Sequence, residues 1–231
     1  MIFSKKAAAF LLAVLLLGGS LAPKSYAEAK AIGGRANDDM KIALTFDDGP
    51  HPKNTPKILD ILAEYGIKAT FFEVGENIEL YPEVSRRVVA EGHEIGNHTY
   101  THAYISKISE DALRKEIQKT EDVLREITGE RPVVFRPPGG YYNDASLKVV
   151  EKMGYRSVLW SLDTRDWSML KCGAIVSKVE KNVKGGDIIL FHDLEDKRLA
   201  TPAALREILP FLVENGYEFV TISQMIENEA D

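Results

Sequence analysis

The chain has 231 residues and a formal net charge of -6, with 45% hydrophobic and 28% charged residues. This length fits one large domain or two small ones, and the composition is ordinary for a soluble globular protein. An acidic chain has no general attraction for nucleic acid or acidic surfaces, so we expect no nucleic-acid partner.

The first 27 residues have the pattern of a secretory signal peptide. Lys5 and Lys6 precede an apolar run over residues 7–17, which is short for a membrane span. Residues 25–27 offer a small-x-small site, so we expect cleavage after Ala27 and a secreted or cell-wall-associated protein; an uncleaved anchor is the alternative. Cleavage removes three lysines and no acid, which takes the formal charge from -6 to -9.

The remaining chain alternates between two kinds of apolar pattern. Residues 28–39 are small and polar and predict a flexible lead-in, and residues 40–228 predict one domain, which we expect to be a monomer. Short β-rich runs predict strands at 42–46, 69–74, 93–96, 133–136, 156–162, 187–191 and 219–222. Spacing near 3.6 predicts helices at 56–65, 83–91, 110–128, 144–153, 174–183 and 202–214.

Helix boundary signals support this alternation. Ser109 and Asn143 are typical N-cap residues. Glycines that stop helices stand at 66, 92, 129, 154 and 216. About seven strands with intervening helices predict a parallel α/β architecture, either a closed barrel or a doubly wound sheet. Cys172 is the only cysteine, so no internal disulfide forms, and we expect it to be a small buried residue.

Polar residues capable of chemistry follow the carboxyl ends of five predicted strands. In a βα barrel, and in the crevice of an open parallel sheet, these ends share one face of the molecule. We therefore expect them to converge, although each residue alone also has an ordinary structural interpretation. The residues are Asp47 and Asp48, His98 and His102, Arg136, Asp163 and Asp166, and His192.

Two of these groups suit a divalent metal. His98 and His102 are four residues apart, a spacing that puts both imidazoles on one face of a helical turn. With Asp48 they make a two-histidine, one-carboxylate set, which leaves positions open for water and substrate and suits Zn²⁺ or another first-row ion. The alternative is that the histidines make ordinary hydrogen bonds and that Asp47 and Asp48 only open a turn before Gly49.

The other groups suit acid–base chemistry and substrate contact. Arg136 stands beside the acids and is expected to pair with one of them, and Gly139 lets a substrate approach main-chain N–H groups. His192 is a candidate general acid oriented by a nearby acid, with a structural histidine as the alternative. Trp167 is either a core residue or a wall of a sugar-binding cleft.

The ordered motifs resemble those of the polysaccharide deacetylases, the NodB-homology type of carbohydrate esterase family 4. They are Thr45-Phe46-Asp47-Asp48-Gly49-Pro50, His98-Thr99-Tyr100-Thr101-His102, Arg136-Pro137-Pro138-Gly139-Gly140, residues 163–167 and Leu190-Phe191-His192. The resemblance covers nearly all of the chain after about residue 40, and it implies a single distorted (β/α) barrel, usually with seven strands.

The resemblance also implies residue roles. Asp47 would be the general base, held by Arg136, and Asp48, His98 and His102 the metal ligands. His192 would be the general acid, oriented by Asp166, with Trp167 and Leu190 shaping the acetate pocket. The family commonly has Tyr where this chain has Gly139, a position that gives its backbone N–H to the oxyanion. Tyr141 and Tyr142 are the candidates to replace the missing ring.

The expected activity is metal-dependent removal of N-acetyl groups from a GlcNAc- or MurNAc-containing polysaccharide, such as peptidoglycan or a chitooligosaccharide, with release of acetate. Zinc is the expected metal, with cobalt, nickel and manganese as alternatives. One rival is an O-deacetylase of acetylated xylan-type polymers, and the other is a carbohydrate-binding relic without turnover.

Overall fold

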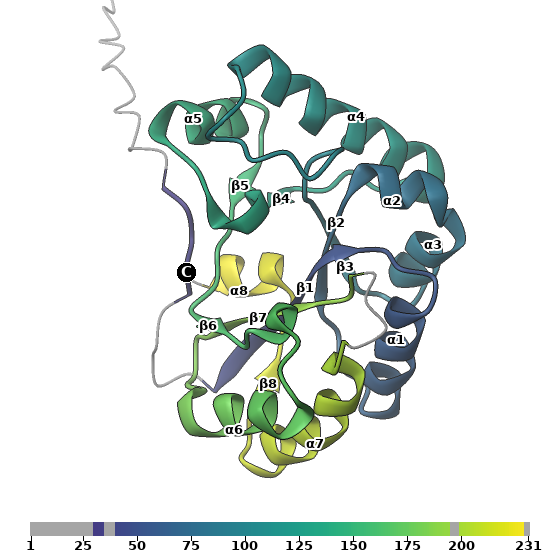
Figure 1. The fold of residues 1–231 in the computed structure, drawn as a ribbon, viewed down its shortest axis with the longest axis vertical. Coiled ribbons are helices and arrows are strands. Elements are labelled where there is room, and N and C mark those ends of the chain that lie inside the picture. The colour runs from purple at the N-terminus through teal and green to yellow at the C-terminus, as the bar shows by residue number, and fades with distance from the viewer. Residues whose placement is uncertain (1–29, 35–39, 195–198, 229–231) are drawn as a thin grey trace, which may run out of the picture.

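The computed structural model describes residues 30–34, 40–194 and 199–228, so the predicted signal peptide lies outside the described residues. These ranges form an α/β fold with central strands and surrounding helices (Figure 1). The strands are β1 (Lys41–Gly49), β2 (Thr70–Glu73), β3 (Glu94–Asn97), β4 (Val134–Phe135), β5 (Arg156–Ser157), β6 (Leu162–Asp163), β7 (Ile188–His192) and β8 (Glu218–Phe219). The helices are α1 (Asn54–Glu64), α2 (Gly75–Leu80), α3 (Pro82–Ala90), α4 (Glu110–Thr128), α5 (Asp144–Lys152), α6 (Cys172–Asn182), α7 (Thr201–Glu214) and α8 (Ile222–Asn228), with 3-10 turns η1 (Pro138–Gly140) and η2 (Asp166–Ser168).

The sheet is parallel and curls into a distorted barrel, as predicted. Its order is β5-β4-β3-β2-β1-β7-β6, with β8 added on β1. Seven flat strands would place the two edges roughly 29 Å apart. However, the edge strands β5 and β6 are joined only by residues 158–161, a link that spans less than about 20 Å. The two edges must therefore bend toward each other.

Two predicted strands end differently in the structure. The predicted strand 156–162 is divided into β5 and β6 because the chain crosses from one edge of the sheet to the other. The predicted strand 219–222 is short, and α8 begins at Ile222. Thr221 N–H donates to Gln224 Oε1 (3.0 Å), and Gln224 N–H donates to Thr221 Oγ1 (3.4 Å). This reciprocal capping box starts α8, a helix that the sequence pattern did not predict. The short helix α2 was not predicted either.

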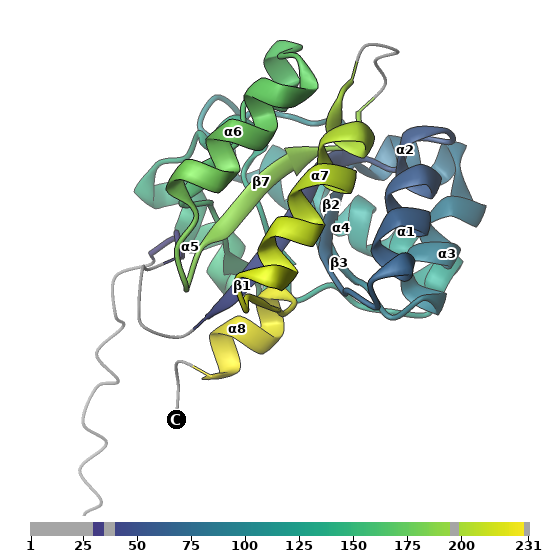
Figure 2. The same cartoon turned by 90° about the horizontal axis from the view of Figure 1, so that it is seen from below.

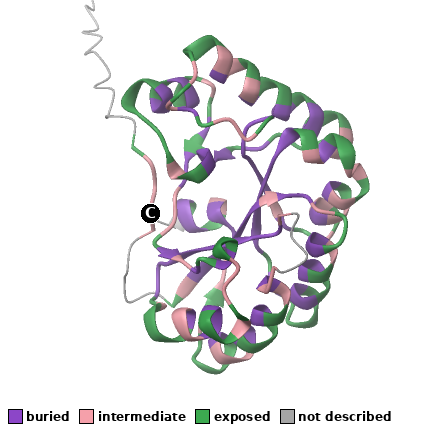
Figure 3. Cartoon of the chain, viewed as in Figure 1, coloured by how far each residue is buried: buried purple, intermediate pink, exposed green. Residues whose placement is uncertain are grey.

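Strand β1 is buried on both of its faces (Figure 3). Ile42, Leu44 and Phe46 belong to the apolar layer between the sheet and the outer helices, whereas Ala43 belongs to the barrel interior. This alternation follows from the two-residue period of a strand, and it explains why the run is apolar throughout. Thr45 and Asp47 continue the inward-facing series toward the carboxyl end of the barrel.

Helices cover the outside of the barrel and one end of it. α6 packs on α7, α7 on α1, and α1 on α3, as seen around the strands in Figure 2. α8 lies across the amino ends of the strands, where Ile222 N–H donates to Thr70 Oγ1 (3.0 Å). Its apolar side chains join the barrel interior. The amino end is thereby packed, which leaves the carboxyl end for a site.

Two expectations about single segments need correction. Part of the predicted flexible lead-in packs on the barrel: Ile32 N–H donates to Ser157 O (2.8 Å), and Leu159 N–H donates to Ile32 O (2.6 Å). Cys172 is half-buried and not fully buried, because it opens α6 at the surface, where its Sγ contacts Glu207 Oε1 (3.4 Å). Burial and the neighbouring Glu207 raise the pKa of this thiol.

Candidate active site

A bulge at the end of β1 directs two adjacent carboxylates into one cavity. In a regular strand, Asp47 and Asp48 would point to opposite faces of the sheet. The pairing of β1 with β2 shifts between Asp47 and Gly49, and Asp48 adopts a left-handed backbone (φ 74°). Asn77 Nδ2 donates to Asp48 O (2.8 Å) and holds this conformation. Both side chains consequently line the same cavity.

His98 and His102 are brought together by a loop after β3, and not by the helical turn that their spacing suggested. Thr99 (φ 64°) and His102 (φ 56°) have left-handed backbones. The loop is held from within, because Thr99 N–H donates to Asn97 Oδ1 (3.0 Å) and Ala103 N–H donates to Thr99 Oγ1 (3.0 Å). The two imidazole centroids lie 5.1 Å apart.

The three predicted ligands fit a divalent metal. Asp48 Oδ1 lies 3.4 Å from His98 Nε2 and 3.0 Å from His102 Nε2, and the three ligand atoms are all within 4.8 Å of one another. His98 Nδ1 donates to Arg136 O (2.8 Å), which leaves the lone pair of Nε2 directed at the site. Burial raises the pKa of Asp48, but hydrogen bonds with His102 and His98 hold it well below its usual range.

Asp47 is paired with a fully buried arginine. Arg136 Nη1 donates to Asp47 Oδ1 (2.7 Å) and to Thr45 Oγ1 (2.8 Å), and Nη2 donates to Leu159 O (2.7 Å). Burial lowers the pKa of Arg136, and the charge of Asp47 opposes that effect. The sequence-based pairing of Arg136 with an acid is confirmed, and it leaves Asp47 Oδ2 facing His98 at 3.8 Å.

His192 lies opposite Asp47 on the neighbouring strand, where the two residues are register partners. Its Nδ1 hydrogen-bonds to Asp166 Oδ1 (2.8 Å), and its backbone N–H donates to Asp166 Oδ2 (2.8 Å). Thr201 Oγ1 also donates to Asp166 Oδ2. Burial lowers the pKa of His192, but the hydrogen bond and charge of Asp166, with Asp47 and Asp48, raise it to about 9. The imidazole is therefore protonated at neutral pH.

These groups surround a cavity of about 320 Å³ at the carboxyl end of the barrel. Of the ten residues to which the family resemblance gives a role, eight line it, while Arg136 and Asp166 lie behind it; Asp163 and Tyr141, which were also named from the sequence, line it as well. The eight are Asp47, Asp48, His98, His102, Gly139, Trp167, Leu190 and His192. Trp167 is 45% exposed, so it is a cleft wall and not a core residue. Tyr104 and Trp160, which were not predicted from the sequence, also line the cavity; the only local signal is that Tyr104 follows His102 by two residues.

Two further buried acids stand behind the β1 bulge. Glu73 is the register partner of Gly49, and its Oε2 accepts a hydrogen bond from Ser85 Oγ (2.7 Å). Asp193 packs so closely against Gly49 that a Cβ there would collide with its carboxylate, and it accepts a hydrogen bond from Thr55. Burial, together with the charge of Asp193, raises the pKa of Glu73 to about 8, although the hydrogen bond from Ser85 lowers it.

Glu73 is expected to make stability fall with rising pH. Its pKa is higher in the folded state (about 8) than its ordinary value of 4.5, so folding is favoured by the bound proton. This contribution is fully present below about pH 4.5 and is lost as pH rises through about 8. Urea unfolding of metal-free protein at pH 5 and pH 8 should show a smaller stability difference for Glu73→Gln than for wild type. The exposed control Glu83→Gln should keep the wild-type difference in unfolding free energy between the two pH values. The same difference in Glu73→Gln as in wild type would contradict this account.

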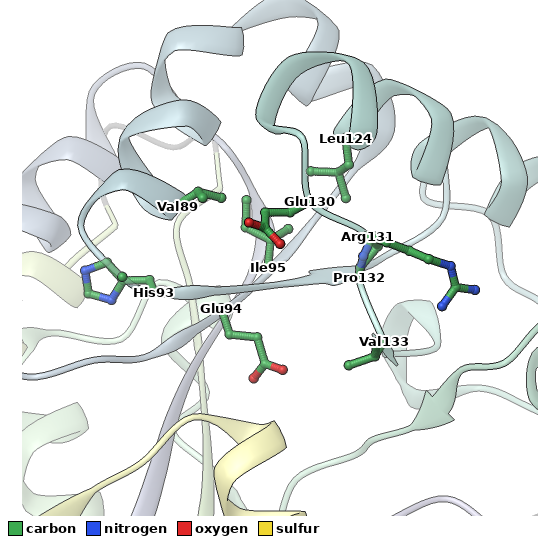
Figure 4. A pocket seen from close by; sticks show the side chains of 10 residues that line it. Val89, His93, Glu94, Ile95, Leu124, Glu130, Arg131, Pro132 and Val133 are labelled. Atoms are coloured by element: carbon green, nitrogen blue, oxygen red, sulfur yellow. The ribbon is translucent and has the colours of Figure 1, made fainter.

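A second cavity, of about 250 Å³, lies near the amino ends of β3 and β4 (Figure 4). Its charged groups are largely paired with one another or with the fold. Arg131 Nε donates to Glu121 Oε1 (3.0 Å), and Glu94 Oε2 accepts from Thr70 Oγ1 (2.8 Å). Burial lowers the pKa of His93 to about 4, so that imidazole is neutral. This cavity lacks the convergent acid, base and ligand set of the first.

Comparison with known proteins identifies the fold and the family. Residues 34–158 match the family described as polysaccharide deacetylase. A peptidoglycan-N-acetylglucosamine deacetylase of Bacillus cereus is 44% identical over 214 residues, which cover 92% of this chain and 98% of the relative. The crystal structure of the Bc1960 peptidoglycan N-acetylglucosamine deacetylase in complex with 4-naphthalen-1-yl-N-oxidanyl-benzamide matches with a TM-score of 0.82 and 41% identity, covering 86% of this chain and 92% of that one.

Other matched structures show how this fold varies in chemistry. A family 4 acetyl xylan esterase of Clostridium thermocellum, solved with a cobalt ion, has a TM-score of 0.77 and 35% identity, over 82% of this chain and 92% of that one. A CE4 family pseudoenzyme of Bacillus anthracis has a TM-score of 0.80 and 27% identity, over 85% of this chain and 69% of that one. Because the same fold occurs with and without activity, the function has to be argued from the site.

Proposed function

Because the chain belongs to the polysaccharide deacetylase family, we propose that it is a metal-dependent hydrolase that removes N-acetyl groups from a GlcNAc- or MurNAc-containing polysaccharide. The observation that carries the proposal is one cavity with three elements: the Asp48, His98 and His102 cluster, Asp47 on its arginine, and His192 on its aspartate. An intact set of this kind argues against a relic that only binds carbohydrate.

The residues divide the hydrolysis between them. A divalent metal held by Asp48, His98 and His102 would polarise the acetyl carbonyl and lower the pKa of water. Asp47 takes the proton of the attacking water, because Arg136 occupies its Oδ1 and leaves Oδ2 on the cavity side. The Gly139 N–H stabilises the developing oxyanion. His192, protonated at neutral pH, then donates a proton to the departing nitrogen.

Metal removal tests the ligand set. We expect chelation to abolish acetate release from chitotetraose, and added Zn²⁺ or Co²⁺ to restore it. His98→Ala should lower the bound metal per protein chain at least tenfold, because three groups supply the ligands. Asp163→Asn, which changes a carboxylate of the same cavity outside the ligand set, should retain the metal. Full activity in the chelated enzyme would exclude this function.

The candidate substrates differ in whether the acetyl group is bound to nitrogen or to oxygen, so the substrate can be identified by comparing the two kinds of polymer. Acetate release from chitooligosaccharides, peptidoglycan and acetylated xylan should be highest on an N-acetylated polymer, since a peptidoglycan deacetylase is the more similar relative. Release from acetylated xylan alone would establish the O-deacetylase, which has support in the esterase structure. If the protein binds these polymers but releases acetate from none of them, it is a carbohydrate-binding relic without turnover.

We also propose that the protein acts outside the cell or in the cell wall. The basic and apolar pattern of residues 1–27 and the cell-wall substrate in the relative's name support this location. Among the described residues, no helix is both long and apolar enough for a membrane crossing. The mass of the exported protein would test cleavage after Ala27. Action as a monomer stays a prediction.

A further inference from the structure

The two histidines of the metal cluster are held in place in different ways. His98 is fixed by the sheet, because its backbone N–H donates to Glu73 O (3.0 Å) and its Nδ1 donates to Arg136 O (2.8 Å). Its side chain is only 1% exposed. The side chain of His102 is 37% exposed, and its imidazole hydrogen-bonds to Asp48, which is itself a proposed ligand. The position of His102 therefore depends on the loop backbone that joins it to His98.

The carboxylate of Glu116, on α4, binds the middle of this loop. Its Oε2 accepts hydrogen bonds from Tyr100 N–H (2.9 Å) and from Thr101 N–H (2.8 Å), and its Oε1 accepts from Thr101 Oγ1 (3.1 Å). Both N–H groups belong to residues that lie between the two histidines. Hydrogen bonds to an ionised carboxylate are stronger than neutral ones, so Glu116 ties the loop firmly to a long helix.

Helix α2 binds the same stretch of the loop through its carbonyl groups. Gly75 N–H donates to Thr99 O (3.0 Å), and Glu76 N–H donates to Tyr100 O (3.0 Å). α2 also packs against α4, next to which it lies in Figure 1. Thr99 has a left-handed backbone (φ 64°), which a β-branched residue keeps only where its surroundings hold it. The loop is thus a strained segment that two helices hold from opposite polar groups.

We propose that Glu116 is a positioning residue for the metal, which acts by fixing the loop so that His102 Nε2 meets Asp48 and His98 at one point. Glu116 is partly buried and is not among the residues that line the cavity, so it has no direct contact with substrate. The inference rests on the proposed function for the presence of a metal. It adds a determinant of metal affinity that lies outside the ligand set.

The test measures metal affinity without turnover. Zn²⁺ is titrated into metal-free protein in competition with a chromophoric chelator. Glu116→Ala should raise the Kd for Zn²⁺ by about tenfold or more, the usual effect of removing a residue that orients a ligand. Glu116→Gln still offers an oxygen to the two N–H groups, so its Kd should lie closer to wild type. The matched control is Glu126→Ala, the same substitution at an exposed position of α4, which should keep the wild-type Kd.

A double variant tests whether Glu116 acts through His102. His102→Ala removes that ligand, so adding Glu116→Ala to it should weaken Zn²⁺ binding by less than about a further twofold. Thermal melting of the metal-free proteins accompanies each titration. Glu116→Asp carries the test if Glu116→Ala does not fold, because it keeps the charge but is one methylene too short for both N–H groups. It should also weaken Zn²⁺ binding.

Wild-type affinity for Zn²⁺ in folded Glu116→Ala or Glu116→Asp would overturn the positioning role. An equal loss in Glu126→Ala, or a full further loss in the His102→Ala background, would also overturn it. Acetate release by the metal-loaded proteins separates these results from failure of the proposed function. If wild type releases acetate and the Glu116 variants keep its affinity for Zn²⁺, the positioning role is wrong and the function stands. If Glu116→Ala weakens Zn²⁺ binding but wild type releases no acetate, the positioning role stands and the function is wrong. A wild-type protein that binds no metal overturns both.

Discussion

Asp47→Asn is expected to reduce kcat for acetate release by about 10²- to 10⁴-fold, the usual contribution of a general base. The asparagine keeps the size of the side chain and still offers an oxygen to Arg136, but it does not accept a proton from water. Bound metal should be retained, because the Asp48, His98 and His102 set is intact. Single-turnover acetate release at saturating metal gives the rate of the chemical step.

A control separates this loss from damage to the fold. Asp47→Asn leaves the fully buried Arg136 without its counter-charge, which costs stability. Urea unfolding must therefore accompany the rate measurement. The exposed surface variant Asp60→Asn, whose partner is Arg87, should match wild type in both assays. A folded, metal-loaded Asp47→Asn enzyme with the wild-type rate would exclude Asp47 as the base.

Asp166→Asn is expected to move the alkaline limb of the kcat profile to lower pH. The proposed general acid works only while His192 is protonated, so activity falls as pH passes its pKa of about 9. Asp166 raises that pKa through its hydrogen bond and its charge, so removing the charge lowers it. The shift is expected to be on the order of one pH unit or more, because a close opposite charge has effects of this size.

The measurement is kcat for a soluble chitooligosaccharide between about pH 6 and pH 10, a range that brackets the alkaline limb. The asparagine that replaces Asp166 still offers an oxygen to the backbone N–H of His192, so the local fold is kept. Asp163→Asn is the matched control, since this carboxylate also lines the cavity but its Oδ1 accepts from Arg165 N–H (2.8 Å). An alkaline limb that stays in place in Asp166→Asn would show that Asp166 does not act through the pKa of His192.

The order of elements and most of the site could be predicted from the sequence, because those signals are local. The N-caps Ser109 and Asn143 accept hydrogen bonds from Ala112 and Ser146, as their positions predict. Gly66 and Gly129 end their helices with left-handed backbones, as Gly does at such positions. The convergence of polar residues also follows from sequence, because the carboxyl ends of parallel strands share one face whatever the loops do.

The detailed geometry depended on contacts between distant segments. No local signal in the sequence predicts that β1 bulges at Asp48, because that conformation is held by Asn77, which lies far along the chain. The division of the strand at 156–162 depends on closure of the barrel, and the placement of Tyr104 against Tyr141 depends on two loops meeting. The sequence by itself determined which residues stand at the strand ends, since period and motif are properties of neighbours. Only the tertiary structure decided which side chains share the cavity, because that is set by packing between segments far apart in the chain.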